Sequence, residues 1–532
     1  MERKGADTMK NYLLCVGGTG TRVLRAVMYS CASGVIQEDE ISVMVIDADQ
    51  ESVVWERAKR DWEKYQYMHS IFMKDKENTK GCFKTNIRLM SENEVISPVN
   101  YSECRTLRES LYGNQELERI MKWLYTEEEM NKDLKEGFFA RPNVGCVFFS
   151  HFKNRVFKSF LEDLTDLIYK DEKVNVMLAG SIFGGTGASG LPTILKLIDR
   201  HVREKGDQFE SKAINNLNVG AVFMLPYFTA RQVEDVKNPM IELNGFNNVS
   251  KESLKYYREG KYFKADKEHW STSFQSLYLV GQDDLDLVNV YAEGGRAQDN
   301  KPHIAEECAA LAVYDFLLKA QTEALERGNT KIFSYKIEEN IGWLDLPCTI
   351  QEAETLERKM GELARFATVY CTGIYEYMNG RFHERNRYIL SNIPQWYVVY
   401  IHKNAANGME QMISDINEYC KFYLEWIYMI QTNMDIDADG EKKYYFNEGM
   451  KLFGKVLSKI NEYLQAGENV ENIIDSIKEI KKDFKELVCL NEGVGYSIKE
   501  IFLILSKLGI IGACGATGGI AGLITGLYQL VG

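Results

Sequence analysis

The sequence predicts an α/β protein: a parallel-sheet domain over residues 1–330, followed by a mainly helical region. Three observations support this prediction. Short apolar runs alternate with helical patterns in the first part of the chain, and two glycine-rich loops there each join a strand to a helix. No proline follows Pro394 in the 532-residue chain. Because proline interrupts helices, its absence from residues 395–532 favours a helical C-terminal region.

The expected strands are short, nearly continuous apolar segments. They cover residues 12–16, 41–47, 144–150, 174–180 and 218–225. Apolar strands that alternate with helices are typical of a parallel sheet buried on both faces.

The first glycine-rich loop follows the first expected strand and contains Gly17, Gly18, Thr19 and Gly20. Glycines let a backbone approach phosphate closely, and the N-terminus of the helix that follows offers unpaired N–H groups. A dinucleotide-binding fold would place a third glycine where this chain has Val23, which disfavours a nicotinamide-dependent oxidoreductase.

The next strand ends in two acidic residues, Asp47 and Asp49. Strand ends of an open α/β sheet face the ligand crevice, so these carboxylates are candidates for contact with a ribose or with metal-bound water. Loop glycines followed by a capping aspartate are the structural alternative.

The second loop contains Gly184, Gly185, Thr186, Gly187 and Ser189, between the strand at 174–180 and a helix. Backbone donors from two such loops can share one polyphosphate, and charge-assisted hydrogen bonds contribute about 1.5–3 kcal/mol each. The Thr186 and Ser189 hydroxyls can add contacts. No Gly-Lys-Ser/Thr follows, so a Walker-type site is excluded.

These segments together resemble the tubulin/FtsZ superfamily. GGTGASG at 184–190 is similar to its signature loop, VGGTGTR at 16–22 to its first glycine loop, and VIDAD at 45–49 to its acidic loop. NVGAVFMLPYF, SLYLVGQ and KPHIAEECAALAVYDFL follow in the family's order, and ARPNVGCVFF at 140–149 resembles a segment of divergent bacterial tubulin-like proteins. The resemblance covers about residues 10–330.

The resemblance implies a GTP site in which the glycine loops hold the phosphates and the acidic loop lies near the ribose or Mg²⁺. The resemblance assigns phosphate contact to the loop residues named above and ribose or Mg²⁺ contact to the two aspartates. It does not decide whether Mg²⁺ is needed. Glu234 is a ribose-contact candidate, although a solvated helix face explains it as well. Asn300 and His303 are candidates for contact with the base, with helix capping as the alternative.

The chain departs from the family after the expected central helix. Family members supply acidic residues from this region to the nucleotide of the next subunit, whereas the stretch here offers only Glu323 and Glu326. Either carboxylate could orient water across a subunit interface, but a solvated helix end is the simpler role. Hydrolysis and polymerisation are therefore weaker expectations than binding.

Composition narrows the partners and the compartment. The formal net charge of −13 disfavours nucleic-acid binding. Eleven cysteines without a CxxC pair fit reduced cytoplasmic thiols and give no zinc motif, and no metal-ligand set is predicted. The acidic turn at 435–440 lacks the twelfth-position glutamate of a calcium loop, which is Phe446 here.

The C-terminus is divided into a mainly helical region, 331–507, and a glycine-rich apolar tail, 508–532, which has no charged residue. An amphipathic helix is expected at 470–488. As a helix the tail would measure about 37 Å, enough for a hydrocarbon core of roughly 30 Å. The sequence allows two alternatives for the tail: association with a membrane, or burial within the protein.

Two functions follow. The first is a GTP-binding protein that self-associates into oligomers or filaments, a candidate GTPase whose tail contacts a membrane or a partner. The alternative is a non-hydrolysing nucleotide-dependent switch or scaffold, for example in a bacterial defence system.

Overall fold

The structure is a computed structural model. It describes residues 9–49, 51–73, 81–91, 95–101, 104–110, 115–135, 137–150, 155–230, 245–259, 274–282, 286–288, 301–322, 325, 330–337, 346–369 and 410–433.

Within these ranges, seven parallel strands form one sheet in the order β3-β2-β1-β4-β5-β7-β9. The strands at 12–16, 41–47, 174–180 and 218–225 predicted from sequence are all present. The bounds are β1 (Lys10–Val16), β2 (Glu40–Ile46), β3 (Asn86–Leu89), β4 (Val174–Ser181), β5 (Leu217–Met224), β7 (Ser276–Gln282) and β9 (Lys331–Ile337). A short parallel pair, β6 (Phe228–Ala230) with β8 (Asp286–Val288), lies apart from this sheet.

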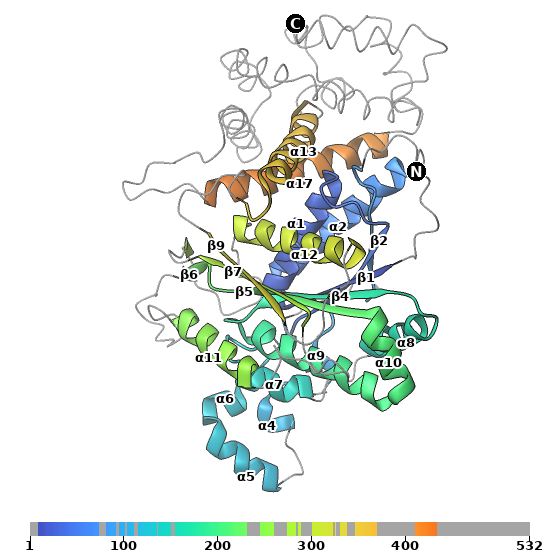
Figure 1. Ribbon diagram of the computed structural model, residues 1–532. Coiled ribbons are helices and arrows are strands. Elements are labelled where there is room, and N and C mark those ends of the chain that lie inside the picture. Colours follow the sequence, from blue (N-terminus) through green and yellow to red (C-terminus); the bar gives the residue numbers. More distant parts are fainter. Residues whose placement is uncertain are drawn as a thin grey trace, which may run out of the picture.

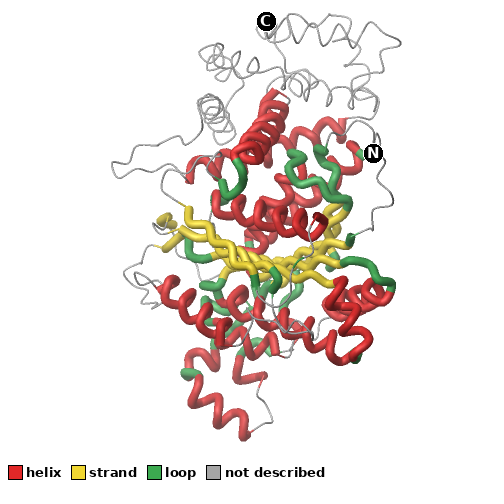
Figure 2. Tube along the Cα trace, in the orientation of Figure 1, coloured by secondary structure: helices red, strands yellow, loops and turns green. Residues whose placement is uncertain are grey.

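Helices cover both faces of the sheet, as Figures 1 and 2 show. One face is covered by α1 (Gly17–Ala32), α2 (Val53–Phe72) and α12 (Ile304–Thr322), and α13 (Ile350–Val369) and α17 (Glu410–Asn433) pack over these helices, farther from the sheet (Figure 1). The other side of the sheet contains α7 (Pro142–Ser150), α8 (Arg155–Tyr169), α9 (Gly185–Glu204), α10 (Asp207–Asn216) and α11 (Gly245–Glu259).

Alternation along the strands produces the two hydrophobic cores. In β1, Leu13 and Cys15 belong to the core beneath α1 and α12, whereas Leu14 and Val16 belong to the core beneath α8 and α9. Successive strand residues point to opposite faces, so a doubly covered sheet needs apolar residues at every position. This explains the continuous apolar runs in the sequence.

The expected strand at 144–150 is wrong: this segment is helix α7. Its buried residues include Val144 and Phe148, four positions apart, which lie on one helical face. Pro142 occupies the first turn, where its missing N–H costs nothing. A short apolar run does not distinguish strand from buried helix, and here the space beside α9 accepts a helix because Gly145 lies against the side chain of Ser189.

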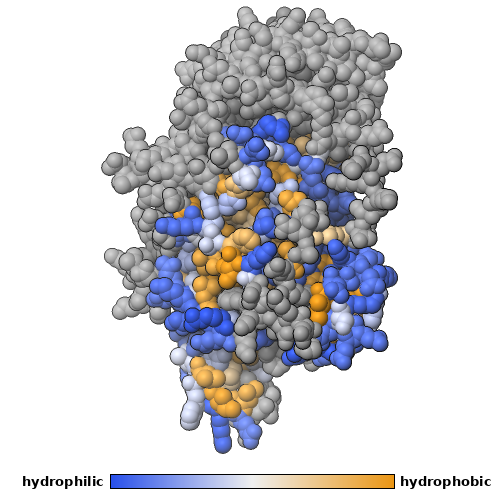
Figure 3. Space-filling model, viewed as in Figure 1, coloured by the Kyte–Doolittle hydropathy of each residue, from blue (hydrophilic) through white to orange (hydrophobic). Residues whose placement is uncertain are grey.

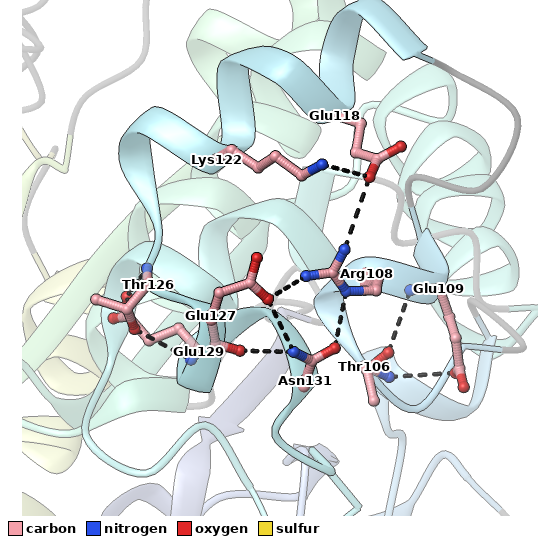
Figure 4. Close-up of polar contacts among 9 residues, drawn as sticks. All are labelled: Thr106, Arg108, Glu109, Glu118, Lys122, Thr126, Glu127, Glu129 and Asn131. Atoms are coloured by element: carbon pink, nitrogen blue, oxygen red, sulfur yellow. Dashed lines mark hydrogen bonds and ion pairs between the residues drawn. The ribbon is translucent and has the colours of Figure 1, made fainter.

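The helices α4 (Leu107–Ser110), α5 (Gln115–Leu124) and α6 (Glu127–Asn131) form an arm that projects away from the sheet (Figure 1), preceded by α3 (Pro98–Tyr101). Arg108 joins the three helices of the arm, as Figure 4 shows. Its guanidinium lies 3.6 Å from Glu118 Oε1 and 2.5 Å from Glu127 Oε2, and its Nε donates to Asn131 Oδ1 at 2.8 Å. One face of α5 is apolar and open to solvent, and an apolar patch is visible on the arm in Figure 3.

The C-terminal helices share the core of the sheet domain. Tyr419, Tyr423 and Trp426 of α17 are fully buried around Tyr29 of α1, and the Trp426 and Tyr29 ring centroids are 4.5 Å apart. β9, just beyond the boundary suggested at residue 330, pairs with β7. The helix expected at 470–488, the acidic turn at 435–440 and the tail at 508–532 lie outside the described residues.

We expect Trp426→Ala to lower the free energy of unfolding by about 3–5 kcal/mol, because it removes a large buried side chain from this interface. Trp123→Ala is the matched control, since Trp123 is 92% exposed, and its change should stay within about 0.5 kcal/mol. Denaturant unfolding of both variants measures the difference. Equal effects of the two substitutions would contradict the packing described for α17.

Candidate phosphate-binding crevice

The strand order places the candidate crevice at the carboxyl ends of β1 and β4. The chain passes from β1 to β2 on one side and from β4 to β5 on the other, so the direction of winding reverses between these two neighbours. Open α/β sheets bind ligands outside the carboxyl ends of strands at such a reversal. Both glycine-rich loops begin at this point, after Val16 and after Ser181.

The first loop is the first turn of α1. The helix begins at Gly17 directly after the strand, its N-cap residue Val16 makes no side-chain capping bond, and its first turn holds no acidic residue. Gly17 has φ of +75°, a conformation that favours glycine. Gly18 and Thr19 are half-buried, whereas Gly20 faces β4, where a Cβ would lie 2.5 Å from the Ala179 carbonyl oxygen.

The second loop is built in the same way. Helix α9 begins at Gly185, and its N-cap residue Gly184 supplies no side-chain acceptor. Gly187 packs against the backbone of Ser181 so closely that a Cβ would overlap its carbonyl oxygen. Ser189 lies one turn deeper, fully buried, and its hydroxyl donates to the Gly185 carbonyl at 2.7 Å.

The two helix N-termini meet. A Cβ on Gly17 would lie 3.3 Å from the amide nitrogen of Gly187 and 3.4 Å from Cβ of Thr186. Each terminus presents backbone N–H groups without capping side chains and carries a partial positive charge. Two such ends in contact form a place where an anion is favoured.

The acidic loop borders the same point. Thr186 Oγ1 donates to Asp47 Oδ1 at 3.0 Å, which links the second loop to the end of β2. The Asp49 amide also donates to Asp47 Oδ1, at 3.3 Å. Both aspartates are buried, at 7% and 6% exposure. Burial, followed by the charge of Asp49, raises the pKa of Asp47 to about 7.

A third loop, Gly137–Arg141, completes the border and was not predicted from the sequence. Gly137, Phe139 and Ala140 have φ of +118°, +48° and +55°. A Cβ on Gly185 would lie 2.7 Å from Phe138 Cβ and 3.2 Å from the Arg141 amide nitrogen. Left-handed non-glycine residues cost about 1–2 kcal/mol each and are concentrated at functional sites. The available signal was the segment ARPNVGCVFF, whose first two residues belong to this loop.

A buried polar cluster lies behind the first loop. Arg22 of α1 lies 3.8 Å from Glu306 of α12, and Tyr227 donates to the same Glu306 oxygen at 3.0 Å. Burial raises the pKa of Glu306. The ring of His303 packs against that of Tyr227 in a tilted arrangement with centroids 5.0 Å apart, and its Nδ1 accepts a hydrogen bond from the Ala305 amide at 3.0 Å, the capping role considered for it.

The remaining predicted site residues, Glu234, Asn300, Glu323 and Glu326, lie outside the described residues. Among the residues described, no group of three or more His, Cys, Asp or Glu side chains is arranged to hold a metal ion.

The fold and crevice define a doubly wound α/β protein with paired glycine loops at the reversal point. A family model described as "Tubulin like" matches residues 13–307, more than half of the chain. The chain therefore belongs to the tubulin-like family, as the loop motifs suggested. Neither the curated proteins nor the solved structures give a match.

Asp47 predicts a pH dependence of stability. An aspartate has a pKa near 3.9 when unfolded. Because the folded value is raised to about 7, the contribution of Asp47 is fully present below pH 4 and is lost as the pH rises through 7. Asparagine does not titrate, so the Asp47→Asn variant should not lose this stability as the pH rises. We therefore expect the free energy of unfolding of the variant minus that of the parent to increase by about 2–4 kcal/mol between pH 5 and pH 8. Urea unfolding across this range tests it, and a constant difference would contradict it.

Proposed function

We propose that this tubulin-like protein binds GTP, with the phosphates held by the N-termini of α1 and α9. The observation that carries the proposal is the contact of two uncapped, glycine-initiated helix ends at the reversal point of the sheet. Membership of the family favours GTP over other anionic ligands.

The residues present suit this ligand. The absence of a Cβ at Gly17 lets the two helix ends touch, and its absence at Gly185 lets the third loop approach α9, so the backbone donors of these segments are brought together. Gly18, Thr19 and Gly184 are half-buried and contribute the open part of the border. A bound nucleotide would bring a hydrolysable terminal phosphoanhydride.

A divalent cation suits the acidic side of the crevice. Asp47 and Asp49 would hold Mg²⁺, directly or through water, beside the phosphates. Neighbouring positive charge favours ionised carboxylate, which would reverse the raised pKa of Asp47. Mg²⁺ should therefore bind more tightly above pH 7 than below it.

We further propose self-association into oligomers or filaments, in keeping with the family. Glu323 and Glu326 are the candidate groups for orienting water in a neighbouring subunit. The alternative is a switch or scaffold that binds GTP without hydrolysing it. Because both use the same crevice, turnover separates them.

The proposed location is the cytoplasm, with membrane or partner contact through the tail at 508–532. Among the helices that the structure describes, none is both long and apolar enough to span a bilayer.

Gly185→Val should abolish GTP binding, because the added side chain would overlap Phe138 and displace the third loop. Gly206→Ala is a suitable control: Gly206 has φ of +88°, so a side chain there strains only its own backbone, and no atom lies within 4 Å of its Cβ position. Isothermal titration of parent and variants with GTP, GDP and ATP provides the measurement. Absence of binding by the parent, or normal binding by Gly185→Val, would overturn the proposal.

Turnover should be measured against protein concentration. A site completed by a neighbouring subunit gives a specific rate that rises with concentration, and Glu323→Gln or Glu326→Gln should then lower it. Binding without turnover at any concentration supports the switch or scaffold instead.

A further inference from the structure

Helix α5 of the arm carries an apolar face that is open to solvent. Trp123 is 92% exposed, Leu124 65% and Ile120 56%. Leu117, one turn before Ile120, is 38% exposed. The four residues recur at short helical steps and form one stripe, the α5 stripe, which contributes to the apolar patch on the arm in Figure 3. Single exposed apolar residues are ordinary, whereas a contiguous group that includes an almost fully exposed tryptophan indicates a contact site.

The arm holds the α5 stripe outward. Met121 of the same helix is buried, and Glu118 lies 3.6 Å from Arg108 of α4 (Figure 4). A rotation of α5 that buried the stripe would break both contacts. Because the arm projects away from the sheet (Figure 1), another molecule can reach the stripe without meeting the body of the protein.

The charges on α5 disfavour a lipid surface as the occupant. Helices that lie on membranes have a basic polar face, which anionic headgroups attract. The charged residues of α5 are two acids, Glu116 and Glu118, and two bases, Arg119 and Lys122. The helix therefore has no basic excess, and the chain as a whole has a net charge of −13. These charges favour a protein as the partner.

The order of these charges fits a second copy of the same helix. Glu116 and Glu118 lie in the first turn of α5, and Lys122 lies in the last. Two copies in antiparallel orientation place each acidic end beside the basic end of the other and oppose their helix dipoles. A parallel pair would bring like charges together.

We propose that two copies of this chain associate through α5, with the helices antiparallel about a twofold axis at Ile120. Leu117 lies three residues before Ile120, and Trp123 lies three residues after it. The axis therefore brings Leu117 of one copy level with Trp123 of the other and places Ile120 against its own counterpart, as an isologous contact requires. The inference rests on the self-association proposed above, for which it names a surface.

Sedimentation of the full chain without nucleotide measures this association. Four side chains make a small contact, so we expect dimers with a dissociation constant of about 1–100 µM. Trp123→Ala and Ile120→Gln should each raise the dissociation constant at least about tenfold, because each removes an apolar anchor from both sides of the contact. Ile332→Gln is the matched control: Ile332 is 53% exposed but lies on β9, and its substitution should leave association unchanged.

Cysteine cross-linking tests the orientation. Ile120→Cys places a thiol on the twofold axis, where oxidation by copper–phenanthroline should join two chains more rapidly than in the parent. Leu124→Cys should not cross-link faster than the parent, because the two copies of residue 124 would lie about 12 Å apart along antiparallel helices, beyond the reach of a disulfide. A parallel pair would cross-link at both positions, and that result would overturn the proposed arrangement.

Three further results would overturn the inference. They are a parent that stays monomeric up to about 100 µM, association that both stripe substitutions leave unchanged, and Trp123-dependent binding to phosphatidylglycerol vesicles by a chain that does not self-associate. If the parent still binds GTP in these cases, the proposed nucleotide site stands. A chain that forms the α5 dimer but binds no GTP would instead overturn the nucleotide site alone.

Discussion

The close approach of two strand–helix turns is the constraint on which the candidate site depends. Gly20 lies against the backbone of Ala179, Gly187 against that of Ser181, and Gly17 faces Gly187. A side chain at Gly20 or Gly187 would push its helix away from the strand ends, and one at Gly17 would push α1 away from α9. Their absence brings two helix N-termini into contact at the edge of one sheet, and the ends of β2 and of the third loop gather around them.

The crevice contains opposing electrostatic demands. The helix ends favour negative charge, whereas Asp47 and Asp49 add carboxylates at close range in a buried setting. Burial and mutual repulsion raise the pKa of Asp47, and the Thr186 hydroxyl only partly offsets this. A phosphate chain accompanied by a cation would satisfy both sides, since phosphate pairs with the donors and the cation with the carboxylates.

Much of the fold could be predicted from the sequence because its strands are buried on both faces. A run such as VNVMLAG allows few other placements once a glycine loop and a helix follow it, and the two glycine loops were expected to share one polyphosphate. The α7 segment was wrongly predicted as a strand because a short apolar run has no clear periodicity. The third loop was not predicted because two of its left-handed residues, Phe139 and Ala140, are not glycines. Glycine is the residue that usually indicates this backbone conformation in a sequence. Pairings between distant segments, such as Thr186 with Asp47 or Arg141 with Glu128, depend on tertiary geometry that residue spacing does not encode.

The central claim is that both helix ends hold one polyphosphate, and amide hydrogen exchange with and without GTPγS, a slowly hydrolysed GTP analogue, tests it most directly. We predict that the amides of residues 17–20 and 185–188 gain protection together, at the same nucleotide concentration, while those of α10 do not change. Protection of one loop alone, or of neither under conditions where the nucleotide is bound, would contradict the account.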